Sequence, residues 1–296
     1  MSNILDSIMS KSIQVMIDES ANDKKLKKFT KKHENKIHFV PIKYRIFGGM
    51  LQSLNIKFGN FIEEAVHQIL IANNNVEILD EYSGKRSNKF QITRESEQLI
   101  DRYITTAEIN TFSDIELKEN YHKLISQIMK NEANENLETI NFKHDVDILF
   151  KDKEKDIIYY TEIKYNDDHD TGKFIDINRK LLKTYAYLIR ELKIYDINKF
   201  KPVLFYFTNK RMKGNIYIPE DEAIFRGKKF FDAFTTIKYE DLEKYMLNIS
   251  ENEATIKQFD DIYKRVVKEK EYSYDEDVTI YSVKEDSQEY QIKGGN

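Results

Sequence analysis

The stretch that most constrains the fold covers residues 144–164 and reads HDVDILFKDKEKDIIYYTEIK. It holds two apolar runs of strand length, 146–150 and 157–164, and the six residues between them carry no apolar side chain. Two such runs joined by a short polar segment are typical of an antiparallel hairpin. The stretch therefore predicts a hairpin whose open end is rich in acidic residues.

Side chains at that open end fall on shared faces. Residues two apart on a strand point to the same side, so Asp145 and Asp147 lie together, and so do Glu162 and Lys164. Carboxylates from one strand and a carboxylate with an ammonium group from the other then meet at one corner of a sheet. The alternative is that these charges only decorate the solvent face of a half-buried strand.

The register of the hairpin decides which acids meet. We pair Phe150 with Ile157, the residues that flank the polar segment, and this brings Asp145 opposite Glu162 with Asp147 on the diagonal. An acid-x-Lys tripeptide alone carries little information in a chain with 51 acidic residues among 296. The strand context and the facing acidic strand are what make this corner a candidate site.

The chemistry that suits such a corner is metal-assisted hydrolysis of a phosphodiester. Two carboxylates suit a hard cation such as Mg²⁺, which takes few protein ligands and binds phosphate oxygens as well. The metal would polarise the phosphate and lower the pKa of a bound water. Two roles are open to Lys164, which either orients or deprotonates that water or neutralises the charge that develops on the phosphate.

The pattern Asp-x-Asp-Ile-Leu-Phe over 145–150, followed by a turn and the residues Thr-Glu-Ile-Lys over 161–164, resembles the core of the PD-(D/E)XK nucleases. The surrounding segments resemble a type II restriction endonuclease of that superfamily. This resemblance implies Mg²⁺-dependent cleavage of double-stranded DNA that leaves 5′-phosphate ends. It places Asp147, Glu162 and Lys164 at the three catalytic positions of the family.

The chain departs from the family pattern at the first acidic position. The proline that often precedes the first aspartate is absent, since His144 precedes Asp145 and Val146 precedes Asp147. We favour Asp147 because an apolar strand follows it at once, and Asp145 stays as an alternative metal ligand. The resemblance also implies the backbone carbonyl of Ile163 as a metal ligand.

Residues 51–71 carry apolar side chains three or four apart and predict a long amphipathic helix with a kink at Gly59. Gly59 and Glu63 match the Gly-x-x-x-Glu that many restriction endonucleases carry on the helix before the sheet, with that glutamate near the metal. The resemblance therefore implies a catalytic role for Glu63. The alternative is an exposed acid on a helix.

The order of elements predicts an α/β fold of the α+β kind with a mixed sheet. We expect a strand at 75–80, the hairpin, a helix with an apolar stripe over 181–192, and a buried strand at 201–209. A strand–helix–strand crossover is right-handed and makes the last strand parallel to the one that bears Glu162. Helix, three strands, helix and strand over about 50–210 is the restriction-endonuclease-like core.

We expect one nuclease domain, with helical additions at both ends of the core. The N-terminal addition, 1–48, is a basic helical arm with a short strand at 36–47. A helix at 117–128 belongs to an insertion between the first two core strands. The C-terminal extension, 211–296, holds a charged helical region at about 239–270, which either packs on the core or joins two subunits, and a tail with an edge strand.

Basic residues are unevenly distributed. A lysine-rich stretch at 24–36 forms either a solvated helix or an arm that lies on phosphates. Two basic loops and a basic patch are candidate DNA contacts, since Arg and Asn read guanine and adenine edges in the major groove, although surface loops of this kind are common. The candidates are Lys85, Arg86 and Asn88 in the first loop, Lys210 and Arg211 in the second, and Lys228 and Lys229 in the patch, which has aromatic neighbours.

Composition excludes several classes of protein. A net charge of −4 argues against a protein that coats nucleic acid by bulk electrostatics, but a nuclease needs only local positive charge. The chain has no cysteine, which excludes disulfides and thiolate metal sites and fits a reducing cytoplasm. Its apolar runs are too short to cross a membrane, and its start lacks the plan of a signal peptide.

These observations predict a type II restriction endonuclease that cuts both strands of DNA at a short palindrome. A two-fold site favours a symmetric homodimer. Two alternatives remain at this point. One is a structure-selective resolvase or repair nuclease on the same core, and the other is a DNA-binding module that has lost catalysis.

Overall fold

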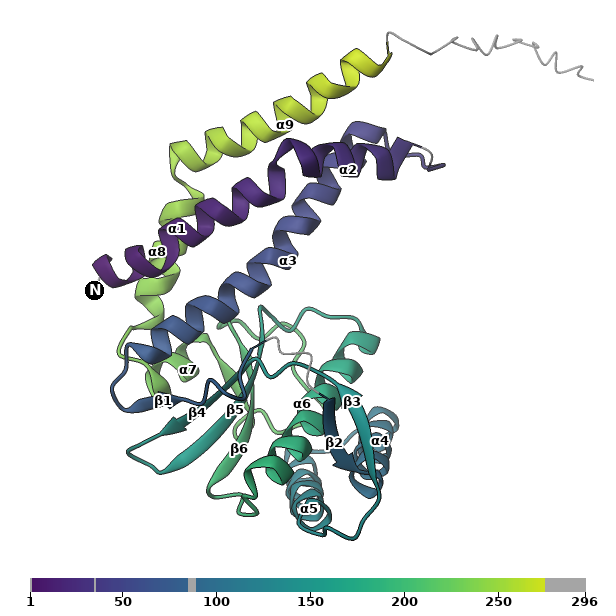
Figure 1. The fold of residues 1–296 in the computed structure, drawn as a ribbon, viewed down its shortest axis with the longest axis vertical. Coiled ribbons are helices and arrows are strands. Elements are labelled where there is room, and N and C mark those ends of the chain that lie inside the picture. Colours follow the sequence, from purple (N-terminus) through teal and green to yellow (C-terminus); the bar gives the residue numbers. More distant parts are fainter. Residues whose placement is uncertain (1, 35, 85–88, 275–296) are drawn as a thin grey trace, which may run out of the picture.

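A five-stranded mixed sheet forms the centre of the molecule, seen in a computed structural model that describes residues 2–34, 36–84 and 89–274 (Figure 1). Its strand order is β1-β4-β5-β6-β7. β1 is antiparallel to β4 and β4 to β5, while β5, β6 and β7 are parallel. The strands are β1 (Val76–Ile78), β4 (Ile148–Asp152), β5 (Ile157–Lys164), β6 (Phe200–Tyr206) and β7 (Ile224–Arg226).

The core order expected from the sequence is confirmed. Helix α3 (Ile42–Ile71) precedes β1, and α6 (Thr171–Leu192) connects β5 to the parallel β6. Helix α3 lies on one face of the sheet and α6 on the other (Figure 1). Each face of the sheet has its own apolar cluster. Ile62 of α3 belongs to one cluster and Leu181 of α6 to the other. The α+β fold class with a mixed sheet is therefore what the chain adopts.

The hairpin register differs from the expected one by two residues. Phe150 pairs with Tyr159 and not with Ile157, because β4 continues to Asp152. The Asp152 carboxylate accepts hydrogen bonds of 3.1 Å from the backbone N–H groups of residues 154 and 155, and this holds a shorter turn. Carried one residue beyond the ladder, the register puts Asp147, and not Asp145, beside Glu162. The two-residue shift leaves every side chain on its expected face.

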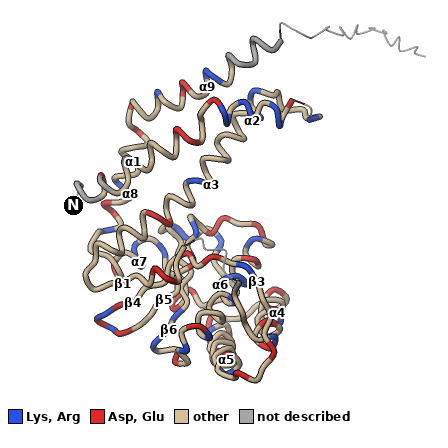
Figure 2. The backbone as a smooth tube through the Cα atoms, in the orientation of Figure 1, with Lys and Arg blue, Asp and Glu red and all other residues tan. Residues whose placement is uncertain are grey.

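The expected strand at 36–47 is wrong. Helices α1 (Ser2–Ala21) and α2 (Asp23–Glu34) come first, residues 36–41 form no regular element, and α3 starts after Pro41. Among the described residues no strand pairs with this segment, and its apolar residues Ile37 and Phe39 are exposed. Helix α3 runs uninterrupted through Gly59. Figure 2 shows the Lys and Arg residues concentrated along α2, which lies beside the N-terminal half of α3.

A small lobe is inserted between β1 and β4. It consists of β2 (Lys89–Thr93), α4 (Arg94–Ile109), α5 (Asp114–Glu132) and β3 (Thr139–Lys143), with β2 and β3 paired as a separate sheet. The helix expected at 117–128 lies within α5, whose start is fixed by a capping box between Ser113 and Glu116. Helix α4 was not predicted.

The C-terminal extension is helical, as expected, with α7 (Gly227–Phe234), α8 (Tyr239–Ser250) and α9 (Glu253–Tyr274). Ile262 and Val266 of α9 belong to the same apolar cluster as α1 and α3, so this region packs on the rest of the chain. The expected edge strand of the tail lies outside the described residues. In the described ranges, every helix is too short or too polar to span a membrane.

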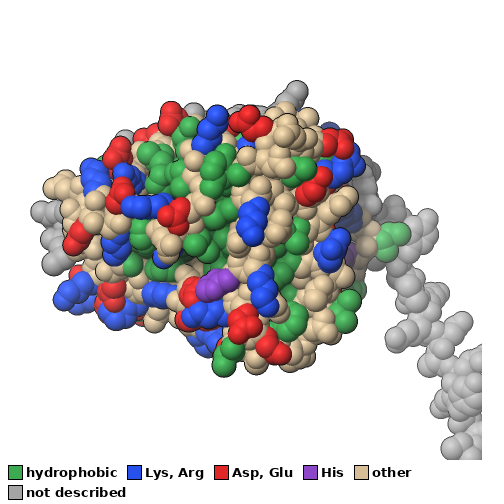
Figure 3. Space-filling view, turned by 90° about the horizontal axis from the view of Figure 1, so that it is seen from below, with side chains coloured by type: hydrophobic (Ala, Val, Ile, Leu, Met, Phe, Trp, Pro, Cys, Tyr) green, Lys and Arg blue, Asp and Glu red, His purple; other side chains and the backbone are tan. Residues whose placement is uncertain are grey.

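The end of the sheet where β6 begins is hollowed and partly apolar (Figure 3). A hollow of about 870 Å³ is lined there by Tyr121 and Met129 of α5 and by Pro202 of β6. The acidic residues singled out in the sequence lie at the opposite end, where β5 ends. The candidate site is therefore on the edge of the sheet that this hollow does not touch.

Candidate active site

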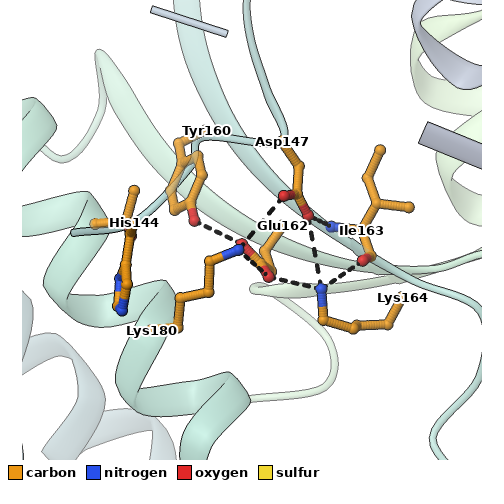
Figure 4. A network of polar contacts seen from close by, with 8 residues as sticks. His144, Asp147, Tyr160, Glu162, Ile163, Lys164 and Lys180 are labelled. Atoms are coloured by element: carbon orange, nitrogen blue, oxygen red, sulfur yellow. Dashed lines mark hydrogen bonds and ion pairs between the residues drawn. The ribbon is translucent and has the colours of Figure 1, made fainter. Parts of the chain in front are cut away.

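The acidic residues meet where β4 begins and β5 ends (Figure 4). Asp147 immediately precedes β4, and Glu162, Ile163 and Lys164 are the last residues of β5. Lys180 reaches the same point from α6. We call these five residues the acid–lysine cluster. Two neighbouring strands and the crossover helix thus supply it, so its geometry depends on the central sheet.

Lys164 lies in a cradle of three oxygen atoms. Its Nζ is 2.6 Å from Oε1 of Glu162, 2.7 Å from the backbone oxygen of Ile163 and 3.6 Å from Oδ2 of Asp147. The N–H of Ile163 donates a 2.8 Å hydrogen bond to the same Oδ2, which ties the start of β4 to the end of β5. A single positive charge is therefore held by two carboxylates and one carbonyl group.

Lys180 is a second ammonium group in the cluster, and sequence reasoning missed it. Its Nζ lies 2.8 Å from Oε1 of Glu162 and 3.4 Å from Oδ1 of Asp147. Ile177 and Thr184, which lie one helical turn before and after Lys180 on α6, are buried. A lysine between buried residues on the same helix face is the signal that could have identified it.

Glu162 is completely buried, and both of its oxygens have donors. Oε1 accepts from the two lysines, and Oε2 accepts a 2.9 Å hydrogen bond from the hydroxyl of Tyr160. Tyr160 is also fully buried and lies two residues earlier on β5, on the same face. The carboxylate is thus fixed in one orientation toward Asp147 and Lys164.

Charges within the cluster oppose the effect of burial. Burial would raise the pKa of Glu162, but Lys164 and Lys180 outweigh it and hold that pKa below its ordinary value. Burial and the Glu162 charge together raise the pKa of Asp147. Burial would lower the pKa of both lysines, yet the two carboxylates outweigh it and raise each pKa. Both lysines are therefore ammonium ions at neutral pH, and Glu162 is ionised.

Glu63 comes to the cluster from α3. Its charge contributes to the raised pKa of Lys164, after the larger effects of Glu162 and Asp147, so the two side chains are electrostatic neighbours. Glu63 lies on α3, the helix that the sequence predicted to carry it. Its proximity agrees with the Gly-x-x-x-Glu resemblance.

Of the two candidate aspartates, Asp147 is the one bonded to Ile163 and close to both lysines. Asp145 lies outside β4 and is half-buried. Between them, the backbone oxygen of Val146 accepts a 2.7 Å hydrogen bond from the N–H of Gly84. The first basic loop, which holds Lys85, Arg86 and Asn88, follows Gly84 and lies outside the described residues.

The second basic loop leaves β6 beside the end of β5. The N–H of Phe207 donates a 2.8 Å hydrogen bond to the backbone oxygen of Lys164. Lys210 and Arg211 follow and are exposed. Asp167, which is fully buried, holds the far side of this loop by accepting hydrogen bonds from backbone N–H groups of residues 212–214. This loop and the acid–lysine cluster therefore share one end of the sheet.

The basic patch of Lys228 and Lys229 lies in α7, and its charges are used largely within the protein. Lys228 pairs with Asp232 and Glu240. The Nζ of Lys229 donates 2.8 Å hydrogen bonds to the backbone oxygens of Asp221 and residue 224. These contacts hold α7 against the preceding turn, so the two lysines have a structural task whatever else they bind.

The cradle has the chemistry of a site for a hard divalent cation. Its donors are carboxylate oxygens of Asp147 and Glu162 and the carbonyl oxygen of Ile163, and such oxygens are the ligands that Mg²⁺ takes. They already surround the Lys164 ammonium, so they can converge on a cation. Across the described part of the chain, no three acidic, His or Cys side chains gather as a metal site. The backbone oxygen of Ile163 is the third donor of this set.

Comparisons with known proteins identify the family of this chain. The family model for the type II restriction endonuclease HinfI matches residues 1–250. The chain is 49% identical over 267 residues to the type II restriction enzyme HinfI of Haemophilus influenzae, an alignment that covers 90% of this chain and 99% of that enzyme. No solved structure matches the chain. With a family match over most of its length and a relative aligned almost from end to end, this chain belongs to the HinfI family of type II restriction endonucleases.

Proposed function

We propose that this restriction endonuclease uses Mg²⁺ to hydrolyse phosphodiester bonds in both strands of duplex DNA and leaves 5′-phosphate ends. The observation that carries the proposal is the cradle of Asp147, Glu162 and the Ile163 carbonyl around a cation. Membership of a type II restriction enzyme family implies a divalent metal in general, and an all-oxygen donor set favours Mg²⁺ among such metals.

Asp147, Glu162 and Ile163 would hold the metal, and Asp145 is the alternative aspartate. When bound there, Mg²⁺ supplies positive charge to the scissile phosphate and lowers the pKa of water. Tyr160 keeps Glu162 oriented for this task through its 2.9 Å hydrogen bond. The contacts of Asp147 with Ile163 and both lysines favour it over Asp145.

We assign Lys164 an electrostatic role. Its raised pKa keeps it protonated, so it is suited to neutralise charge on the phosphate and is a poor base in this state. This favours the second of the two roles that the sequence left open. Glu63, as an electrostatic neighbour of Lys164, would keep that ammonium directed toward the substrate.

The first and second basic loops are the proposed DNA contacts. Lys210 and Arg211 are exposed beside the end of β5, and the loop with Lys85, Arg86 and Asn88 follows a residue bonded beside Asp147. We assign base reading to one or both of these loops, because Arg and Asn match guanine and adenine edges. Lys228 and Lys229 would contact only phosphates, since they are engaged with the protein.

We further propose that the enzyme acts as a homodimer on a short palindrome, because a two-fold protein places one active site on each strand. The working compartment would be the cytoplasm. A chain without cysteine is compatible with that reducing compartment, where its DNA substrate lies.

The direct test is incubation of plasmid DNA with the wild-type enzyme and Mg²⁺, which should give discrete fragments with 5′-phosphate ends. Lys164→Ala should lower the cleavage rate by about 10²–10³-fold, the size of effect seen when one charge-stabilising donor is lost. Lys183→Ala is the matched control, because Lys183 pairs with Glu97 and Asp101 and not with the cluster, and it should cut normally. Undiminished cutting by the Lys164 variant would refute the site.

The two alternatives have separate outcomes in the same experiment. A resolvase or repair nuclease would cut branched DNA and leave a linear duplex intact. A DNA-binding module without catalysis would bind the plasmid in a salt-dependent way and produce no fragments. Membership of a restriction endonuclease family favours cutting of the linear duplex over both.

A further inference from the structure

We propose that Lys180 is an internal counter-ion of the active site, which competes with the divalent metal ion for Glu162 and Asp147 until DNA binds. The proposal rests on the proposed function, because it takes these two carboxylates as the metal ligands. It concerns how tightly the free enzyme binds metal, a property that can be measured without cleavage.

Lys180 bridges the two carboxylates and approaches them from a different side than Lys164 (Figure 4). Its Nζ lies 2.8 Å from Oε1 of Glu162 and 3.4 Å from Oδ1 of Asp147. Lys164 faces the other oxygen of Asp147 and the carbonyl group of Ile163. A metal ion that takes both carboxylates must therefore displace the contacts of Lys180 as well as those of Lys164.

The position of Lys180 on α6 keeps its ammonium group close to the cluster. Ile177, Leu181 and Thr184, the residues around it on the helix, are buried against the sheet. Its side chain is 25% exposed, so the long apolar stem is largely covered while the charged end faces the carboxylates. The ammonium group can therefore move only by rotation about the bonds of its own side chain, so it stays close to the cluster.

Before metal arrives, the acidic side chains of Asp147 and Glu162 already pair with the ammonium groups of Lys164 and Lys180. A divalent cation added to this set meets two positive charges, which weakens its binding. A DNA phosphate brings negative charge to the same point and gives a displaced ammonium group a new partner. Metal and DNA binding are therefore coupled, and each strengthens the other by the same factor.

The test is a calorimetric titration of the full-length enzyme with Mn²⁺ in the absence of DNA, which measures the affinity for the metal. Lys180→Met keeps the apolar stem and removes the charge. We expect it to bind Mn²⁺ about 10-fold more tightly than the wild type, at the lower end of the effects of residues that support metal ligands. With a non-cleavable duplex bound, the difference between the two proteins should shrink.

Lys183→Met is the matched control. Lys183 lies three residues further along α6, and its Nζ pairs with Glu97 at 2.9 Å and Asp101 at 3.4 Å, away from the cluster. The control loses the same charge from the same helix, so it should leave the affinity for Mn²⁺ unchanged. Lys180→Arg retains the charge and should bind Mn²⁺ as weakly as the wild type.

Equal or weaker Mn²⁺ binding by Lys180→Met would overturn the proposal. If that variant does not fold, Lys180→Gln replaces it in the same titration and must also bind more tightly. Glu162→Gln separates the two levels of inference. If wild-type Mn²⁺ binding survives that change, the proposed metal site is wrong. If it is lost while the Lys180 variants match the wild type, only the counter-ion role fails.

Discussion

At the scale of single residues, the proposed active site depends on one completely buried carboxylate. Glu162 accepts hydrogen bonds from Lys164, Lys180 and Tyr160, so its orientation and its charge are both set by the protein. A buried carboxylate is costly unless every oxygen has a donor. The tyrosine contributes no charge, and its effect on the site is therefore purely one of position.

We predict that Tyr160→Phe lowers the cleavage rate about 10–100-fold, because Glu162 loses the donor that orients it. Single-turnover cleavage of a labelled duplex measures this. Tyr185→Phe is the matched control, since Tyr185 is equally buried and its hydroxyl donates a 2.6 Å hydrogen bond to the backbone oxygen of Phe200, away from the site. Both variants should lose about 1–2 kcal/mol of stability. Equal cleavage by the two would show that Tyr160 has no positioning role.

At the scale of elements, loops are held by buried acids. Asp167 accepts hydrogen bonds from the backbone N–H groups of Met212, Lys213 and Gly214, and from Arg226 at 3.0 Å. Burial would raise the pKa of this carboxyl group, but these donors outweigh it and lower the pKa. One ionised side chain thus fixes the turn that carries the second basic loop.

We predict that Asp167→Asn destabilises the protein by about 2–3 kcal/mol, the range for hydrogen bonds to a buried charge, and also weakens DNA binding. The second effect follows because the basic loop loses its anchor. Urea unfolding and duplex titration measure the two. Asp152→Asn is the control, since Asp152 fixes the hairpin turn at the other end of the sheet. Unchanged DNA affinity in the Asp167 variant would contradict the prediction.

Helix α5 carries two glutamates whose stability contributions should change with pH in opposite directions. Burial raises the pKa of Glu132 above its ordinary value of 4.5. As the pH rises through this range, Glu132 ionises in the unfolded chain before it ionises in the folded protein. The stability of the folded protein therefore falls. Hydrogen bonds from Ser113 lower the pKa of Glu116, whose contribution is present above 4.5 and is lost as pH falls.

Urea unfolding between pH 3 and 7 checks these signs. For each variant we take the free energy of unfolding of the wild type minus that of the variant. For Glu132→Gln we expect this difference to fall as the pH rises. The same difference for Glu116→Gln should rise with pH. Slopes of the same sign would contradict the prediction, and flat curves would mean that neither carboxyl group has a shifted pKa in the folded protein.

Helix α2 contains the lysine-rich stretch, for which the sequence left two alternatives, a solvated helix or an arm that lies on DNA phosphates. Six of its 12 residues are lysine, and only Leu26 is buried. We predict that changing Lys27, Lys28 and Lys31 to Gln makes DNA affinity less dependent on salt. In a plot of the logarithm of affinity against the logarithm of salt concentration, the slope should become less steep by about 0.9 for each phosphate that the helix no longer neutralises. The same change at Lys244, Lys257 and Lys264, on α8 and α9, is the control. An unchanged slope would make α2 a solvated helix.

At the scale of the whole molecule, the described residues of one chain form the acid–lysine cluster once, and in the proposed mechanism each DNA strand is cut by a separate cluster. We predict a homodimer with twice the chain mass of 35.3 kDa in sedimentation experiments. Mixed dimers of wild type and Lys164→Ala should nick one strand of a plasmid and accumulate open circles. A single-chain mass on DNA, with linear product from mixed samples at the full rate, would refute the dimer.

The sequence by itself determined the local features of this protein. Alternation of side chains fixed the strands of the hairpin and the faces on which Asp147, Glu162 and Lys164 lie. A nearly continuous apolar run identified β6, and the handedness of crossovers made it parallel to β5. These properties follow from neighbouring residues and from chain geometry, so they are readable without knowledge of distant contacts.

Only the tertiary structure decided which of these groups touch. Asp152 extends β4 and shortens the turn, and this brings Asp147 rather than Asp145 to Glu162. Lys180 lies 18 residues beyond Glu162 and meets it only because α6 crosses back over the sheet. The protonation of both lysines likewise depends on the two carboxylates beside them, whose charges outweigh the effect of burial. Contacts and charge states result from packing between distant segments, whereas a pattern of residues records only what each segment can form.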